Sequence, residues 1–542
     1  MRVVMAEQIR EMDRLTIANG AASGAELMDR AGSGLAKVIR NICRWRQLTH
    51  PCIRMVAGKG NNGGDVYAAA YYLLRHFADL EIVLVGDPAQ LQGEALWHYD
   101  RVREHVVCET MLATDELGVR AWCDAADIVV DGLLGTGATG APRDRIASAI
   151  RAINHARANG VLVVAVDVPS GMNANTGIAV GDAVVADFTV TMGLPKMGML
   201  QSAAQSFLGC VDVIDIGIPA SVVDEVLLGG EESDHTGENA SCESVLSLHS
   251  QARYISGADV RKWLPPRARV SHKGTYGRVL VIGGAPRYIG AVVMAAQAAC
   301  RSGAGLVYVL TPEPVAGRVA QLVPEAMVFA GKSRSDGGLA SDALRSIKKK
   351  LPDIDTVLLG PGMMCHADGA QLIKSAYDFV SETIILDADA LNVLAAYNVA
   401  LTDHPEKRVI LTPHPGEAAR LLDVFRTVIQ ADRVNVVQRL AEKYHAVVVL
   451  KGAGTLISDG ALCGVNLTGT PGMATGGSGD VLAGMIAALC AQVPGPWEAA
   501  SAGVYVHGLA GNMAALEASE VGMTAEHLCG MVPKAFGWVL GR

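Results

Sequence analysis

Three aspartates in the N-terminal half stand beside glycine or serine at the ends of aliphatic runs. Asp65 closes the loop GKGNNGGD, Asp131 precedes GLLGTGATG, and Asp167 precedes Val-Pro-Ser-Gly. Glycines let the backbone approach a ligand, and successive N–H groups at a helix start form an anion nest. No Gly-Lys-Ser/Thr follows, so the first loop is not a Walker loop. A structural turn or a helix cap explains any one aspartate, but three together favour a ligand site.

The C-terminal half carries a denser signal, GTPGMATGGSGDVLAG, at residues 469–484. Gly476, Gly477 and Gly479 precede Asp480, and the aliphatic residues 481–489 predict a helix after them. Backbone N–H groups at a helix N-terminus can stabilise the charge that develops during phosphoryl transfer. Asp480 would accept a hydroxyl proton, as the catalytic aspartate of kinases does. The alternative is a glycine-rich helix cap.

Other turns of the C-terminal half are consistent with a nucleotide site. KGAGT, residues 451–455, could place a lysine and two glycines near a phosphate, and GPGM contains Gly362. TPHPGE contains His414, although a lone histidine is more often structural. In DADALN, Asp387, Asp389 and Asn392 form a candidate Mg²⁺-binding face.

Short aliphatic runs must position these turns. Unbroken β-branched runs indicate strands buried on both faces, hence parallel sheets covered by helices. Strands that alternate with helical patterns predict a doubly wound α/β architecture in each half, with ligands outside the carboxyl ends of the strands. The expected strands cover residues 53–57, 82–85, 128–130, 161–166 and 184–190, then 279–282, 306–310, 357–359, 383–386, 409–411 and 447–450.

One segment separates the two halves. Residues 229–244, GGEESDHTGENASCES, are acidic and polar and cannot bury enough apolar surface to fold alone. We therefore expect a domain at 1–227, a linker at 228–250 and a domain at 251–542. A long surface loop within one domain is the alternative, but such loops are uncommon in compact domains.

Length and composition narrow the class of protein. A chain of 542 residues exceeds one hydrophobic core. The net charge of −9 argues against a general nucleic-acid binder. No apolar run reaches the roughly 18 residues that span a bilayer, and the charged start MRVVMAEQIREMDR is unlike a secretory signal. Eleven scattered cysteines without a C-x-x-C pair indicate reduced thiols and a cytoplasmic protein.

The N-terminal motifs GNNGGD, DGLLGTGATG, DVPSGMNANTG and LPKMGML together resemble the NAD(P)H-hydrate epimerase family over roughly residues 1–220. The resemblance implies a Rossmann-like fold that interconverts the R and S forms of NADHX and NADPHX. It implies K⁺ ligands at Asn62, Asp131 and Ser170, and oxygen donors suit a hard cation. Asp167 is the candidate acid/base, since a carboxylate can serve the proton traffic at the hydroxyl. Val66 departs from the family, which usually has glycine there.

The resemblance also implies the positions that bind the hydrate, which are Asn61, Asn62, Gly63, Gly64, Asp65, Gly135, Thr136, Gly137, Ala138, Thr139, Gly140, Ala141 and Asp167.

About residues 250–540 resemble the ADP-dependent NAD(P)H-hydrate dehydratase family, a ribokinase-like fold that phosphorylates the hydrate so that loss of phosphate restores NAD(P)H. The resemblance implies hydrate binding by Ala291, Gly362, His414 and Asp480. It implies nucleotide binding by Lys451, Gly452, Ala453, Gly454, Thr455 and Gly479.

Together the halves predict a bifunctional NAD(P)H-hydrate repair enzyme, an isomerase fused to a lyase. K⁺ would serve the first domain, and Mg²⁺ with ADP the second, which yields AMP and phosphate. The expected partners are small molecules (NADHX, NADPHX and ADP), with no nucleic acid, no membrane and assembly as a homo-oligomer. One alternative is a ribokinase-like vitamin-precursor kinase fused to a non-catalytic nucleotide-binding module, and another is an N-terminal half that binds without catalysis.

Overall fold

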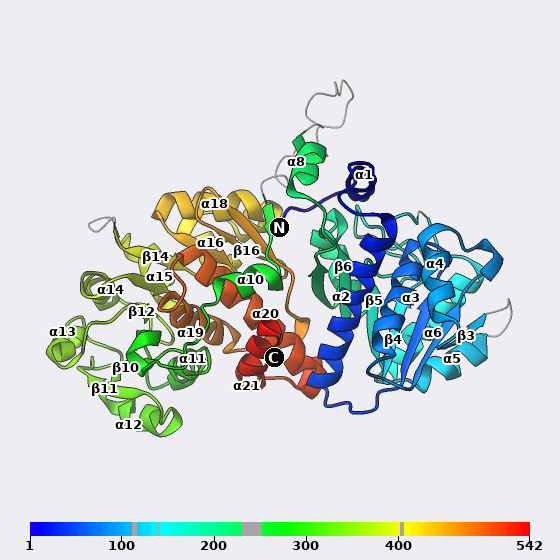
Figure 1. Ribbon diagram of the computed structural model, residues 1–542. Helices are drawn as coiled ribbons and strands as arrows, with labels where there is room; N and C mark the ends of the chain where they lie inside the picture. The colour runs from blue at the N-terminus through cyan, green and yellow to red at the C-terminus, as the bar shows by residue number, and fades with distance from the viewer. Residues whose placement is uncertain (111–115, 139, 229–251, 402–405, 542) are drawn as a thin grey trace. The chain divides into compact units, whose positions relative to one another are not determined.

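The computed structural model describes residues 1–110, 116–138, 140–228, 252–401 and 406–541. The chain forms two compact units, residues 1–250 and 251–542 (Figure 1). The linker predicted at 228–250 lies outside the described residues except for Leu228. No helix among the described residues is long and apolar enough to cross a membrane. The ten cysteines of the described segments are all free.

The N-terminal unit is built on a seven-stranded parallel sheet of order β3-β2-β1-β4-β5-β6-β7. Its strands are β1 (Ile53–Ala57), β2 (Leu80–Leu84), β3 (Val107–Thr110), β4 (Ile128–Gly132), β5 (Leu162–Val166), β6 (Phe188–Met192) and β7 (Cys210–Ile214). Its helices are α1 (Ala6–Ala18), α2 (Gly24–Trp45), α3 (Asn61–Leu73), α4 (Gly93–Val102), α5 (Glu116–Asp124), α6 (Asp144–Ala158), α7 (Gln205–Leu208) and α8 (Ala220–Leu228).

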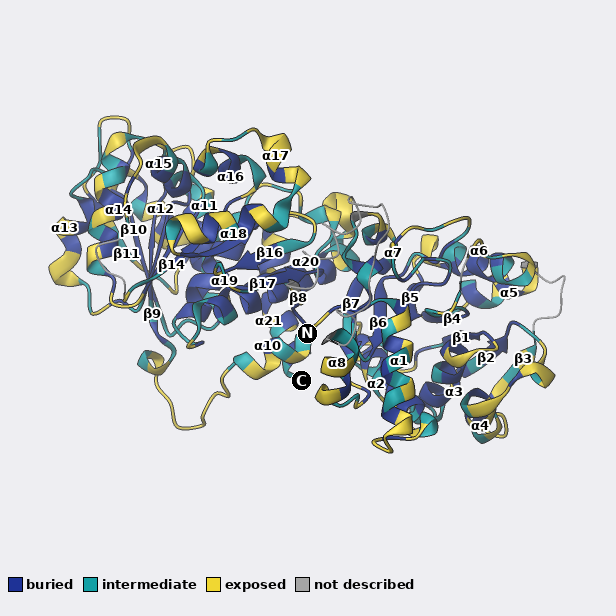
Figure 2. Cartoon of the chain, turned by 90° about the horizontal axis from the view of Figure 1, so that it is seen from above, coloured by how far each residue is buried: buried dark blue, intermediate teal, exposed yellow. Residues whose placement is uncertain are grey.

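Helices cover both faces of this sheet. Val56, Val129 and Val163 pack against residues of α5 and α6, and strand residues that alternate with them face the side of α3. The inner strands are accordingly drawn as buried in Figure 2. The strand order reverses between β1 and β4, and ligands of such sheets bind at the carboxyl ends beside this switch point.

The C-terminal unit has a ten-stranded sheet of order β11-β10-β9-β12-β13-β14-β15-β16-β17-β8. Its strands are β8 (Ala252–Tyr254), β9 (Arg278–Ile282), β10 (Leu306–Pro312), β11 (Met327–Gly331), β12 (Thr356–Leu359), β13 (Thr383–Leu386), β14 (Arg408–Leu411), β15 (Val447–Leu450), β16 (Thr455–Ser458) and β17 (Cys463–Asn466). Its helices are α10 (Gly257–Trp263), α11 (Ile289–Arg301), α12 (Glu313–Leu322), α13 (Ala343–Ile347), α14 (Ala367–Phe379), α15 (Asp389–Tyr397), α16 (Pro415–Leu422), α17 (Arg426–Ala431), α18 (Arg433–Tyr444), α19 (Ser478–Cys490), α20 (Pro496–Gly522) and α21 (Ala525–Leu540). Helices α11, α19, α20 and α21 pack on one another.

The doubly wound architecture is confirmed, with two corrections. The strand expected at 184–190 begins only at Phe188, because Val184 N donates to Ser170 O and Val185 N to Asn154 Oδ1 instead of to a neighbouring strand. The C-terminal sheet is not purely parallel: β16 runs antiparallel to both β15 and β17. The connection from β15 to β16 is too short for a parallel crossover, so the chain turns back as a hairpin.

Candidate active sites

The glycine loop after β1 is shaped by close backbone contacts. A Cβ atom on Gly63 would lie 1.9 Å from Gly58 O, and one on Gly58 would lie 2.0 Å from Leu133 O. Only glycine permits these approaches, so the start of α3 lies against the segment that follows β4. The first turn of α3 therefore carries Asn61 and Asn62 to the carboxyl ends of both strands.

The predicted K⁺ ligands belong to one hydrogen-bonded network. Asn62 Nδ2 donates to Leu134 O at 2.9 Å, and Leu134 N donates to Ser170 Oγ at 2.9 Å. Ser170 Oγ in turn donates to Asp131 Oδ1 at 2.6 Å, and Ser170 N to Asp131 Oδ2 at 2.9 Å. Residues from α3, the end of β4 and the segment after β5 are thus brought together.

Asp131 is fully buried, and burial raises its pKa to about 6 although hydrogen bonds from Ser170 and Leu133 N oppose the shift. Among the described residues no lysine, arginine or histidine forms an ion pair with Asp131. A buried carboxylate without a counter-ion, beside the Asn62 and Ser170 oxygens, is a donor set that fits a hard monovalent cation.

Asp167 follows β5 with a positive φ of 63°. Its Oδ1 accepts hydrogen bonds from the Lys196 ammonium, from Thr191 Oγ1 at 3.1 Å and from Met192 N at 3.1 Å. Lys196 is buried and was not among the predicted site residues. The signal that could have found it is a lone lysine in the apolar stretch LPKMGML.

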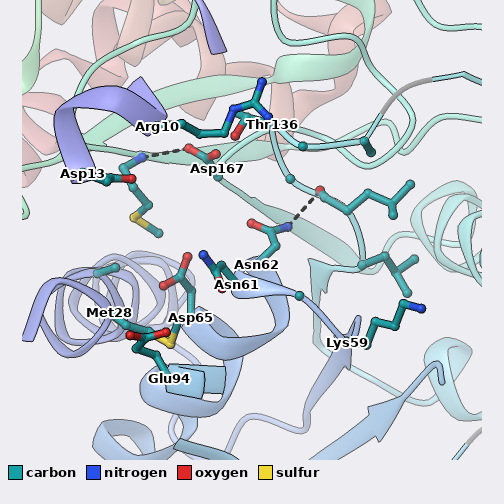
Figure 3. Close-up of a pocket in the computed structure, with 18 of the residues that line it drawn as sticks. Arg10, Asp13, Met28, Lys59, Asn61, Asn62, Asp65, Glu94, Thr136 and Asp167 are labelled. Atoms are coloured by element: carbon teal, nitrogen blue, oxygen red, sulfur yellow. Dashed lines mark hydrogen bonds between the residues drawn. The ribbon is translucent and has the colours of Figure 1, made fainter. Parts of the chain in front are cut away.

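A cavity of about 780 Å³ lies over these loops. Asp13, Asp65, Asp167 and Lys196 lie on its wall, and Figure 3 shows the three aspartates facing it from different elements. Burial raises the pKa of Asp13 to about 6, and burial with the nearby Asp167 and Asp13 charges raises that of Asp65 well above its usual range. Basic residues also line the cavity, namely Arg10, Lys59, Arg143 and Arg145.

Most predicted hydrate-binding positions of this unit face that cavity: Asn61, Asn62, Asp65, Gly135, Thr136, Gly137, Ala138 and Asp167. Gly63 and Gly64 are instead buried within α3, Gly140 lines a second cavity of about 30 Å³, and Ala141 lies near Gly181. Thr139 lies outside the described residues. Val66 is fully buried against Gly132, which explains how this chain accommodates valine there.

In the C-terminal unit, Asp480 stands in the first turn of α19 behind Gly477, whose φ is 95°. Burial raises the pKa of Asp480 to about 7; the Asp387, Asp389 and Glu417 charges add to the rise, and the Lys451 charge opposes it. An aspartate with a pKa near neutrality is suited to accept and release a proton.

Lys451 lies at the centre of this charge cluster. Its Nζ donates to Asp387 Oδ1 at 2.9 Å and lies 3.8 Å from Glu417 Oε2. Thr412 Oγ1 also donates to Asp387 Oδ1, at 2.7 Å. A Cβ on Gly479 would lie 3.4 Å from Lys451 Nζ, so the KGAGT turn and the start of α19 adjoin.

The KGAGT turn holds its shape through two glycines and an arginine. Gly452 has φ 144° and Gly454 φ 62°, both favourable only for glycine. Arg433 donates from α18 to Ala453 O and to Leu450 O. Thr455 is the first residue of β16, so the predicted nucleotide-binding residues 451–455 form the turn of the β15–β16 hairpin, whereas Gly479 lies on α19.

Two further predicted positions lie together. Gly362 has φ 63°, and a Cβ there would lie 3.3 Å from Ala291 Cβ.

His414 caps α16: its Nδ1 accepts hydrogen bonds from Gly416 N and Glu417 N. Burial and the Lys451 charge lower the pKa of His414 to about 4, which makes it a neutral histidine.

The candidate Mg²⁺ face is largely occupied by protein contacts. Asp387 pairs with Lys451, Asp389 Oδ2 accepts from Met364 N at 2.9 Å, and Asn392 Oδ1 accepts from Arg420 at 2.9 Å. No group of three or more His, Cys, Asp or Glu side chains within the described ranges is arranged to hold a metal. Protein side chains alone therefore do not form a Mg²⁺ site among these residues. This agrees with the usual coordination of Mg²⁺ by one or two carboxylates together with the phosphates of the substrate.

Fold and sites together define an α/β enzyme with a Rossmann-like unit followed by a ribokinase-like unit. Residues 279–534 match the family model described as NAD(P)H-hydrate dehydratase, and residues 24–198 match the one described as YjeF-related protein N-terminus. Because relatives of that name are more than 30% identical over nearly its whole length, the chain belongs to the bifunctional NAD(P)H-hydrate repair enzyme family.

Similar proteins extend over nearly the whole chain. The bifunctional NAD(P)H-hydrate repair enzyme of Moorella thermoacetica is 36% identical over 541 residues, which cover 98% of this chain and 96% of the relative. That of Coxiella burnetii is 37% identical and covers 96% of each chain. A crystal structure of the ADP/ATP-dependent NAD(P)H-hydrate dehydratase of Bacillus subtilis with ATP and Mg²⁺ is 30% identical, covers 53% of this chain and 98% of that one, and has a TM-score of 0.47.

Proposed function

We infer that the chain repairs hydrated nicotinamide cofactors in two steps. The N-terminal unit epimerises R and S NAD(P)HX, and the C-terminal unit dehydrates the S form to NAD(P)H at the expense of ADP, which becomes AMP and phosphate. The observation that carries this inference is the similarity to bifunctional repair enzymes along 98% of the chain, through both units.

In the C-terminal unit we assign Asp480 the acceptance of the hydroxyl proton as the hydroxyl attacks the terminal phosphoryl group of ADP. Its position in the first turn of α19 supports this role, because backbone N–H groups there face developing negative charge. The hydrate would contact Ala291, Gly362, His414 and Asp480. The nucleotide would contact residues 451–455 and Gly479, with Mg²⁺ carried on its phosphates.

In the N-terminal unit we assign Asp167 the proton transfer at the hydroxyl of the hydrate. A K⁺ ion would be held by Asn62, Asp131 and Ser170, and it would supply a positive charge to the site. The oxygen-rich network and the uncompensated charge of Asp131 support this proposal. We also propose that the chain assembles as a homo-oligomer.

The test uses a racemic hydrate mixture and the absorbance of reduced nicotinamide. With ADP and Mg²⁺, the whole mixture should return to NAD(P)H, because the N-terminal unit replenishes the reactive epimer. Rapid recovery that stops at half of the mixture would contradict the epimerase assignment. No ADP-dependent recovery at all would favour the vitamin-precursor kinase.

We further propose that residues 1–227 and 251–542 are independent domains, since each unit has its own sheet and core. A chain cut between them should retain both activities in separate fragments. A C-terminal fragment that is inert while the intact chain works would contradict this division.

A further inference from the structure

Three carboxyl groups of the N-terminal cavity lie near one ammonium group. Asp13 comes from α1, Asp65 from α3 and Asp167 from the end of β5, and all face the cavity in Figure 3. Lys196 is the charged group that favours ionisation of both Asp13 and Asp65. One positive charge cannot fully compensate three adjacent carboxylates, so the pKa values of Asp13 and Asp65 are raised by burial and by the neighbouring carboxyl groups.

The hydrogen bonds of Lys196 determine which carboxyl group is ionised. Its three N–H groups are directed to Asp167 Oδ1, to Thr191 Oγ1 at 2.8 Å and to Met192 O at 2.9 Å. None remains for Asp13 or Asp65. Asp167 Oδ1 accepts from Lys196, Thr191 and Met192 N, so this oxygen carries no proton.

Asp13 is in the opposite situation. Its Oδ1 is buried and has no hydrogen-bond partner among the described residues. A buried carboxylate oxygen without a donor is costly, whereas a neutral carboxyl group costs much less. The charged groups around it are Lys196, Asp167 and Asp65, with Arg10 one helical turn away on α1.

We propose that Asp13 is the acid of the epimerisation and Asp167 its complementary base. This assignment rests on the proposed epimerase function, because the hydroxyl that receives the proton belongs to the hydrate. Two carboxyl groups in one cavity whose surroundings favour opposite protonation states form an acid/base pair. The family resemblance described above assigns no role to Asp13.

Asp13 gives its proton to the hydroxyl as the C–O bond breaks, the bonding electrons stay with oxygen, and water leaves. The ring nitrogen lone pair forms a C=N double bond. Water then adds to the opposite face of the carbon and gives a proton to the Asp167 carboxylate. After this step Asp167 carries a proton and Asp13 is ionised, which is the arrangement that the reverse reaction needs. Proton exchange with solvent restores the original arrangement.

The test compares Asp13→Asn with Glu11→Gln, a change of an acid on the same helix that pairs with Arg14 at the surface. Epimerisation is followed by separating the R and S hydrates without nucleotide, so that the C-terminal unit is idle. We expect Asp13→Asn to lower kcat about a hundredfold with KM nearly unchanged. Glu11→Gln should behave as the unsubstituted chain, and ADP-dependent dehydration of the S form should be normal in both.

The pH profile separates proton transfer from a structural role. In the unsubstituted chain kcat should fall as pH rises and Asp13 loses its proton, and Asp13→Asn should abolish this limb. If Asp13→Asn unfolds, the same pH profile is measured on Asp13→Glu. A change in the pH at which kcat falls supports the assignment, and an unchanged pH overturns it.

Two other outcomes overturn the assignment. One is a kcat within about threefold of the unsubstituted chain, well short of the loss expected for a proton donor. The other is a large kcat loss in Asp65→Asn but not in Asp13→Asn. If the unsubstituted chain dehydrates the S form but does not interconvert the epimers, the proposed epimerase function is wrong, and this assignment is wrong with it.

Discussion

The Lys451 ammonium donates to the Asp387 carboxylate at 2.9 Å, and the Asp387 side chain is only 2% exposed. The same ammonium lowers the pKa of Asp480, which burial and the Asp387 charge raise. One lysine therefore compensates a buried charge and also adjusts the proton affinity of the candidate base. These two effects can be separated by substitution.

Lys451→Met should impair the C-terminal unit in two ways. Asp387 would be left buried without its counter-ion, which costs about 3–5 kcal/mol of unfolding free energy. The pKa of Asp480 should rise further, so the rate of dehydration should reach half its maximum at higher pH. Denaturant unfolding and a pH–rate profile measure the two effects. Lys443→Met, which removes an exposed lysine that donates to Leu421 O, is the control and should change neither.

Dehydration should depend on pH through Asp480. Its pKa is about 7, and a base must be unprotonated, so the rate should rise with pH through about 7 and then level off. Asp480→Asn should lower this rate at least about a hundredfold while nucleotide binding and epimerisation persist. Near-normal dehydration by Asp480→Asn would mean that the aspartate only caps α19.

Stability should show the opposite trend with pH. The pKa of Asp480 rises from 3.8 to about 7 on folding, so between these values the folded chain binds more protons than the unfolded one. The contribution of Asp480 to unfolding free energy therefore falls as pH rises from about 4 to about 7. Asp480→Asn should remove this contribution. The melting temperature of the C-terminal unit at pH 8 minus that at pH 4 should therefore be larger in Asp480→Asn than in the unsubstituted chain. An unchanged difference would contradict the raised pKa.

Ser170→Ala should weaken the K⁺ site. It removes the oxygen that accepts from Leu134 N and donates to Asp131. We expect half-saturation of epimerisation to require about tenfold more K⁺, equivalent to about 1.4 kcal/mol. The K⁺-induced rise in melting temperature should shrink as well. Ser148→Ala, in which the lost hydroxyl accepts from Arg151, is the control; equal K⁺ dependence in both variants would contradict the site.

Gly63→Ala and Gly60→Ala test the loop after β1. Alanine favours a helix over glycine by about 1 kcal/mol, so Gly63→Ala would stabilise α3 if space allowed. Because the added Cβ would lie 1.9 Å from Gly58 O, we expect a loss of about 1–3 kcal/mol and impaired epimerisation. Nothing lies within 4 Å of a Cβ at Gly60, so Gly60→Ala should fold normally. Calorimetry and the epimerase assay compare the two.

The inner strands could be predicted because they are buried on both faces. Ile53–Ala57, Thr383–Leu386 and Val447–Leu450 begin and end where the aliphatic runs do. Strand β3 was missed because its residues VCET alternate between exposed and half-buried positions at the edge of the sheet and include a glutamate. Strand β16, TLIS, was missed because its aliphatic run is only Leu456 and Ile457, and β17, CGVN, was missed because it includes glycine and asparagine.

The sites were predictable where the sheet alone dictates them. Asp131 and Asp167 follow parallel strands, and the carboxyl ends of such strands meet at one edge. Asp13 carries no such signal, because it lies on a helix more than a hundred residues away along the chain and reaches the cavity only through the packing of α1. The contact between Lys451 and Glu417 was equally hidden, since Lys451 follows β15 whereas Glu417 lies on α16, after β14.

The backbone of Asp167 has a consequence for engineering this enzyme. A left-handed φ of 63° is strained by about 1 kcal/mol in a residue with a Cβ and is relaxed in glycine. Asp167→Gly would relieve this strain, but it would leave the buried Lys196 ammonium without its carboxylate, which costs about 3–5 kcal/mol. The ion pair outweighs the strain, so a screen that rewards heat resistance alone should retain the acid at position 167. Directed evolution for thermostability would thus keep the proposed base of the epimerase even when turnover is not measured.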